Sequence, residues 1–201
     1  MMKNILTRAA ALVAAVVFTM IMTSCSATYD ENEIISASAE LIEASYDINT
    51  VFFGSGLPYV ESDDEVLRHW EIAPDSPYHT KEEIKAATLA VYSPDYAEFL
   101  FEKAFAGFVV SAGDEDSVDA DQIIDARYVE YGDRLVILPI AEDEIMKLDR
   151  TYDTSGITVL SQKRGRAVLS VPSFVDGVPA DEVELAVVMT ADGWRLDTPT
   201  Y

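Results

Sequence analysis

The chain has 201 residues with 36 acidic and 14 basic side chains, and its formal net charge is −22 at neutral pH. A field this negative repels nucleic acid and anionic lipid headgroups, which excludes a nucleic-acid-binding protein and favours basic proteins or cations as partners. Hydrophobic residues make up 49% of the chain, a composition that argues against a disordered protein. The charge is also consistent with a simpler role, which is to keep an exported protein soluble.

The first 24 residues have the layout of a secretory signal peptide. Lys3 and Arg8 form a short basic start, and every residue from Ala9 to Met22 except Thr19 is apolar. This apolar run is too short to cross a bilayer as a mature helix, which needs about 20 residues. We therefore expect the segment to direct export and to be removed.

Cys25 is the only cysteine and follows small residues at the expected cleavage point. This position predicts a bacterial lipobox, in which the thiol is acylated and becomes the new N-terminus. An ordinary signal peptide with a chance cysteine, or an uncleaved anchor, is the alternative. With Cys25 lipidated, no thiol remains for disulfides, metal binding or catalysis. We expect an extracytoplasmic lipoprotein held at the cell membrane, with a charge of 12 − 36 = −24 on the mature part.

Residues 25–33 are polar and acidic and are predicted to be a tether, followed by a single α+β domain over 34–201. Apolar residues at helical spacing predict a helix over 33–48. A glycine-rich loop dense in aromatics follows over 51–59; its phenylalanines Phe52 and Phe53 are expected to pack in the core, although an exposed contact loop is the alternative. Alternation over 66–72 predicts a short strand.

Two helices are predicted next from their capping residues. Thr80 and Glu83 form a capping box, so a helix is expected from there to about Tyr92. Ser93 is the expected N-cap of a second helix, with Pro94 in its first turn, where the missing N–H costs nothing. That helix is expected to end near residue 107.

A dense acidic stretch over 111–122 marks the main change in composition. Its carboxylates are hard oxygen ligands of the type that calcium prefers, but the glycine and glutamate that an EF-hand loop needs at its sixth and twelfth places are missing. A solvated loop is therefore favoured over a calcium site. As a separate hypothesis, the same residues are candidate contacts with a charged partner. The residues concerned are Asp114, Glu115, Asp116, Asp119 and Asp121.

Past this stretch the hydrophobic pattern changes to period two, which indicates an antiparallel sheet. A hairpin is expected around Gly132-Asp133 and a helical turn over 143–149. Pro172 marks a bulge or a sheet edge. The predicted strands are 126–131, 134–138, 157–162, 166–174, 182–190 and 194–196. The fold class is α+β, with N-terminal helices packed on a curved antiparallel sheet formed mostly by the C-terminal half.

No motif in the chain indicates an enzyme. His69 and His79 are the only histidines and lack zinc-ligand spacing, so no metal or other cofactor is predicted. Ser55 lies in a Gly-Ser-Gly sequence that is not a nucleophile elbow. A glycosidase-like pair of carboxylates stays open, because only three-dimensional separation decides it. Lys163, Arg164 and Arg166 form the one basic spot, most simply a solubilised hairpin tip.

Three stretches together resemble a known family: the helix–break–helix that begins at Thr80-Lys81-Glu82-Glu83 and continues through Ser93-Pro94-Asp95, the strand–turn–strand from Tyr128 to Val136, and the ending Asp192-Gly193-Trp194-Arg195-Leu196. The combination resembles the D,L-endopeptidase inhibitor (IseA) family of Gram-positive bacteria. The ending is also similar to small cone-shaped domains like nuclear transport factor two. The resemblance covers roughly residues 40 to 201.

The resemblance implies a non-enzymatic protein that inhibits a peptidoglycan hydrolase, with a basic NlpC-type cysteine peptidase as its partner. No contact residue of that family can be assigned to a position here, and an anchor on Cys25 departs from a freely secreted inhibitor. Two alternatives stay open. One is a cone-shaped domain whose pocket, lined by Trp70 and Tyr128 with one carboxylate, holds a small ligand; the other is a passive envelope lipoprotein.

Overall fold

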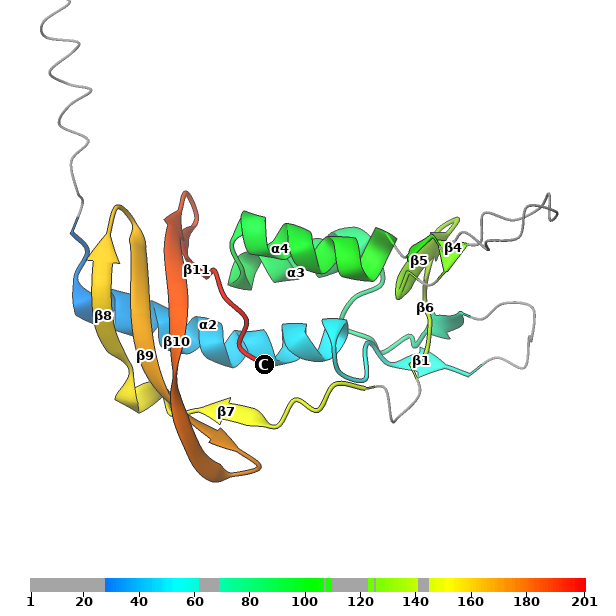
Figure 1. Ribbon diagram of the computed structural model, residues 1–201. Helices are drawn as coiled ribbons and strands as arrows, with labels where there is room; N and C mark the ends of the chain where they lie inside the picture. Colours follow the sequence, from blue (N-terminus) through cyan, green and yellow to red (C-terminus); the bar gives the residue numbers. More distant parts are fainter. Residues whose placement is uncertain (1–27, 62–68, 107, 110–122, 125, 141–144) are drawn as a thin grey trace, which may run out of the picture.

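The computed structural model describes residues 28–61, 69–106, 108–109, 123–124, 126–140 and 145–201. The predicted α+β class is confirmed: helices lie between antiparallel sheets at either end of an elongated body (Figure 1). The helices are α2 (Glu31–Phe52), α3 (Lys81–Val91) and α4 (Pro94–Phe101), which continues into the π-helical turn η1 (Glu102–Ala106).

The long helix α2 begins where Asp30 caps it, since the Asp30 side chain accepts from the Asn32 N–H at 2.8 Å. The helix ends at Phe52, one turn later than the sequence indicates, so the expected loop from residue 51 begins too early. Phe52 is only 6% exposed, and Phe53 is partly buried against the same core, which confirms the packing predicted for both rings.

The caps of α3 and α4 are confirmed. The Thr80 hydroxyl accepts from the Glu83 N–H at 3.1 Å, and the Glu83 carboxylate accepts from the Thr80 N–H at 3.2 Å, which completes the capping box. Ser93 accepts from the Tyr96 N–H, and Pro94 occupies the first turn of α4. Both helices therefore begin at the predicted residues.

The first sheet has four short antiparallel strands in the order β1-β2-β6-β5. These are β1 (Tyr59–Val60), β2 (Trp70–Ile72), β5 (Tyr128–Tyr131) and β6 (Arg134–Ile137). The predicted two-residue turn between β5 and β6 is confirmed, with Gly132 at φ +65°. A separate pair joins β3 (Phe108–Val109) and β4 (Ile123–Ile124).

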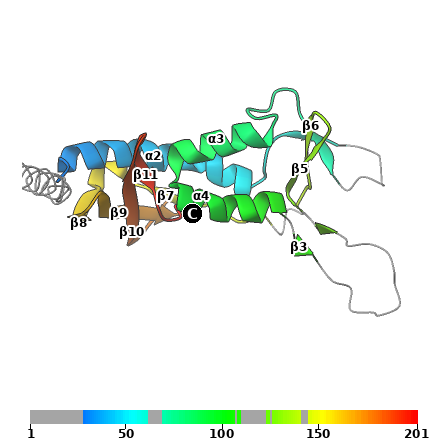
Figure 2. The same ribbon diagram turned by 90° about the horizontal axis from the view of Figure 1, so that it is seen from above.

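The second sheet is a half-barrel from the C-terminal part of the chain, built on β9, which pairs with β10 along one edge and with β7 and β8 along the other. β11 extends it beyond β10. Its concave side covers the first half of α2, and Figure 2 shows the helices running from this sheet to the first one. The strands are β7 (Arg150–Tyr152), β8 (Thr158–Lys163), β9 (Arg166–Val175), β10 (Val178–Thr190) and β11 (Gly193–Leu196), with the 3-10 turn η2 (Thr154–Gly156) before β8.

Three sequence predictions for this region have clear outcomes. Pro172 lies opposite the register shift between Ala180 and Val183, which confirms the predicted bulge. The helical turn expected over 143–149 is wrong for residues 145–149, which lead in irregular conformation into β7. The strands form two larger sheets rather than one. Buried side chains from the helices and from both sheets join in one hydrophobic cluster.

Candidate functional site

Residues 197–201 follow β11 and lie between α2 and the helix pair α3–α4 (Figure 1). At the start of this segment, the Ser93 N–H donates to the Leu196 carbonyl at 2.7 Å, and the Asp197 N–H donates to the Ala186 carbonyl at 2.8 Å. The Ala186 N–H in turn donates to the Thr198 hydroxyl. The segment is therefore fixed both to β10 and to the junction between α3 and α4.

A buried polar network joins this segment to α2 and α3. The Tyr92 hydroxyl donates to Asn49 Oδ1 at 2.8 Å, and Asn49 Nδ2 donates to the Thr200 hydroxyl at 2.9 Å. The Thr200 hydroxyl lies 2.7 Å from the Ser45 hydroxyl, to which it donates, and Ser45 donates to the Ile42 carbonyl. Every side chain in the network has a partner, as buried polar groups require.

Burial raises the pKa of the Tyr92 hydroxyl to about 12, although its hydrogen bonds with Thr200, Ser45 and Asn49 pull the other way. A phenol with this pKa stays protonated at neutral pH. Tyr92 therefore acts as a fixed hydrogen-bond donor and not as a general base.

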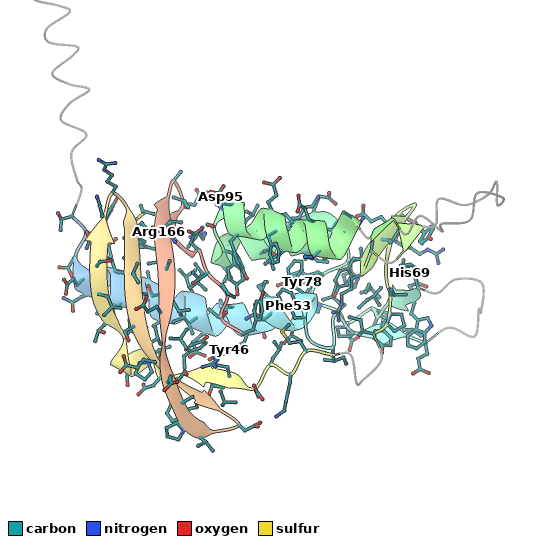
Figure 3. The ribbon with its side chains drawn as sticks, in the orientation of Figure 1. Tyr46, Phe53, His69, Tyr78, Asp95 and Arg166 are labelled. Carbon is teal, nitrogen blue, oxygen red and sulfur yellow. The ribbon has the colours of Figure 1, made fainter. Side chains whose placement is uncertain are left out.

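A cavity of about 90 Å³ lies between this network and β7. Tyr46 projects from α2 toward β7 (Figure 3), and its hydroxyl accepts from the Tyr152 N–H at 3.1 Å. Arg150 donates to the Ser173 hydroxyl at 2.7 Å. The lining residues are Tyr46, Asn49, Thr50, Leu148, Arg150, Thr200 and Tyr201.

The chemistry available in this cavity is limited. None of its lining side chains is a carboxylate, and burial raises the pKa of Tyr46, so no lining side chain serves as a base at neutral pH. Its volume is enough for about three water molecules and lies far below the several hundred Å³ of a typical small-molecule site. The cavity therefore does not support a small-ligand or acid–base function.

Trp70 and Tyr128, the side chains predicted to line a pocket, lie on either side of Ile137 in the first sheet, since β6 runs between their strands. Neither lines the cavity. The Trp70 ring packs 4.9 Å from the ring of Tyr59. Tyr128 is fully buried, and its hydroxyl donates to the Val51 carbonyl at 2.8 Å. Their role as pocket residues stays a prediction.

Arg127 is a structural residue that sequence reasoning missed. The residue is 7% exposed, and its guanidinium donates to the carbonyls of Phe52 at 3.1 Å and Gly54 at 2.6 Å. These carbonyls lie at the C-terminal end of α2, where a cation is favoured by the helix dipole. Burial lowers the pKa of Arg127 from its usual value, but the group remains a cation.

The outward face of α2 is strongly acidic. The helix carries five carboxylates and no lysine or arginine, and all five are exposed. Three of them, Glu33, Glu40 and Asp47, recur every seven residues and so follow one side of the helix. The five are Glu31, Glu33, Glu40, Glu43 and Asp47. Glu31 lies on another side of the first turn, and we call the other four, Glu33, Glu40, Glu43 and Asp47, the α2 acidic face.

Several predicted sites lie outside the described residues, among them Cys25 and the acidic stretch from Asp114 to Asp121. The two histidines are described. His69 Nε2 lies 3.1 Å from the Ala126 carbonyl, and His79 is exposed before α3.

Within the described ranges, no group of three or more histidine, cysteine or acidic side chains is placed to hold a metal ion. The same ranges contain no helix that is long and apolar enough to span a bilayer.

No protein-family model matches the chain, and no curated protein is significantly similar to it. The family resemblance therefore depends on the residues quoted for it alone.

Proposed function

We propose that the protein is a lipid-anchored, extracytoplasmic binding protein that inhibits a peptidoglycan D,L-endopeptidase, in the manner of the IseA family. The partner in this proposal is a basic hydrolase of the NlpC type, and the protein itself is not an enzyme. The half-barrel wrapped around α2 is, in the same proposal, a cone-like domain similar to nuclear transport factor two. In this proposal the signal peptide directs export, and the lipid on Cys25 holds the protein at the outer surface of the membrane.

The observation that carries the inhibitory role is the α2 acidic face. Four exposed carboxylates on one side of a helix that carries no lysine or arginine produce a negative surface of fixed shape. Surfaces of this kind speed the encounter with a positively charged partner and favour one orientation of the complex. The effect weakens as salt is added, because the Debye length is about 8 Å at physiological ionic strength.

The proposal is tested by following the digestion of purified cell wall by a NlpC-type hydrolase. The fragment from Ser26 onward is expected to slow digestion when added in molar excess. The variant E33Q/E40Q/D47N is expected to raise the inhibition constant by about tenfold at low salt, because it removes three charges from one side of α2.

The variant E98Q/E102Q/D133N is the matched control, since it removes three exposed charges away from α2. It is expected to change the inhibition constant much less. Equal effects of both variants would show that only net charge matters and would remove the α2 acidic face from the account. Unchanged digestion with the unmodified fragment in excess would contradict the inhibitory role itself.

A further inference from the structure

Tyr29, two residues before the start of α2, is bonded to the second sheet. The Tyr29 N–H donates to Gln162 Oε1 at 2.6 Å, and Gln162 Nε2 donates back to the Tyr29 carbonyl at 3.0 Å. The Tyr29 ring also packs edge-on to Trp194 at 5.0 Å. Residue 29 is thus fixed to β8 and β11, although it precedes the first described helix.

The turn between β8 and β9, which carries two basic residues, lies next to Tyr29. Gln162 is followed directly by Lys163 and Arg164, which are both exposed at the turn between β8 and β9. Arg164 at φ +53° and Gly165 at φ +75° form a tight two-residue turn with left-handed backbone. The two cations therefore occupy a fixed position beside Tyr29.

We propose that the β8–β9 turn rests on the anionic lipid headgroups of the membrane that holds the protein. The inference depends on the membrane anchoring in the proposed function but not on the inhibitory role. It places the β8–β9 edge of the half-barrel against the membrane, whereas the first sheet lies at the opposite end of the body in Figure 1.

The length of the connection supports this contact. Three residues lie between Cys25 and Tyr29. The four Cα–Cα steps from Cys25 to Tyr29 span about 14 Å at most when fully extended. An anchor at Cys25 thus keeps Tyr29, and the turn beside it, close to the headgroups. The exposed cations of the turn are then within about one or two Debye lengths of a negative surface.

The charges around the turn are mixed. The protein as a whole is repelled by an anionic membrane, so a weakly held body would turn its acidic surfaces away. Of the nearby carboxylates, Asp197 pairs with Arg166, whereas Asp30, Glu31 and Glu33, which follow Tyr29, are exposed. Asp192, in the neighbouring turn between β10 and β11, offsets part of the charge of Lys163 and Arg164. The contact therefore depends on the two cations of the turn and not on the net charge of this end.

Lysine acetylation of the membrane-purified protein tests this orientation. The protein is reconstituted into phosphatidylcholine vesicles with or without phosphatidylglycerol, and labelling of each lysine is followed by mass spectrometry. With the anionic lipid, acetylation of Lys163 is expected to slow by about fivefold, and high salt is expected to reverse this. Lys85 on α3 is the internal control and is expected to react equally in both vesicles.

A pair of single variants locates the effect. R164Q is expected to restore part of the Lys163 labelling on anionic vesicles. R134Q, which removes an exposed arginine from the first sheet, is expected to leave it unchanged. Equal changes in Lys163 and Lys85, or equal slowing of Lys163 on neutral vesicles, would overturn the proposed contact. Absence of the protein from the membrane fraction would overturn it together with the anchoring, whereas failure of the digestion assay would leave it standing.

Discussion

Replacing Arg127 by methionine is expected to lower the free energy of unfolding by about 3 kcal/mol, because the change removes two charge-assisted hydrogen bonds from a buried site. The guanidinium donates to the carbonyls of Phe52 and Gly54, and no other side chain donates to these oxygens among the described contacts. Methionine fills a similar volume, so the loss reports the polar contacts and the charge at the end of α2. Urea unfolding followed by circular dichroism measures it.

Arg134 provides the matched control for this measurement. Its side chain is 64% exposed and lies 3.6 Å from Glu71, so R134M is expected to change the free energy of unfolding by less than about 0.5 kcal/mol. A loss of similar size in both variants would show that Arg127 does not hold the end of α2 in the way described.

Replacing Tyr92 by phenylalanine is expected to cost about 1–2 kcal/mol at pH 8, because Asn49 and Thr200 lose a buried partner. This cost is expected to depend on pH. Since burial raises the pKa of Tyr92 to about 12 from 10.0, the protonated hydroxyl stabilises the fold fully below pH 10, and that contribution is lost as pH rises toward 12.

The stability gap between the wild type and Y92F is therefore expected to narrow by about 1 kcal/mol between pH 8 and pH 11. Urea unfolding at the two pH values gives this difference. Y131F is the control, because Tyr131 is 48% exposed. The difference in stability between the wild type and Y131F is expected to be the same at both pH values. If the difference in stability between the wild type and Y92F did not change with pH, Tyr92 would not be the buried hydrogen-bond donor described here.

The elements that were predicted well are those whose signals are local. The caps at Thr80 and Ser93 act on groups three residues away, so the sequence around them contains the whole interaction. The turn at Gly132 joins two strands that are neighbours in the chain. Such features are confirmed without knowledge of the rest of the fold.

The errors concern residues whose partners are distant in the chain. The first helix was predicted to end at residue 48, but α2 continues to Phe52. In this last turn Asn49 is buried and bonded to Thr200, which is 151 residues away. β7 is three residues long and is defined only by its pairing with the end of β9. Short segments of this kind carry too little periodicity for a strand to be recognised.

The buried sites were the least predictable part. Arg127 stands beside Tyr128 at a predicted strand, where an arginine is ordinarily an exposed residue, and its partners near residues 52 and 54 are backbone carbonyls that leave no trace in the sequence. The cavity near Tyr46 is formed by residues from α2, by Leu148 and Arg150 before and at the start of β7, and by the last two residues, Thr200 and Tyr201. No spacing rule joins these positions.

Mass spectrometry of the native protein, isolated from its own cells, tests the central claim most directly. The account predicts a chain that begins at Cys25 and carries added acyl mass on that residue. A chain that still contains residues 1–24, or a Cys25 thiol without any modification, would contradict the lipid anchor and with it the proposed lipoprotein.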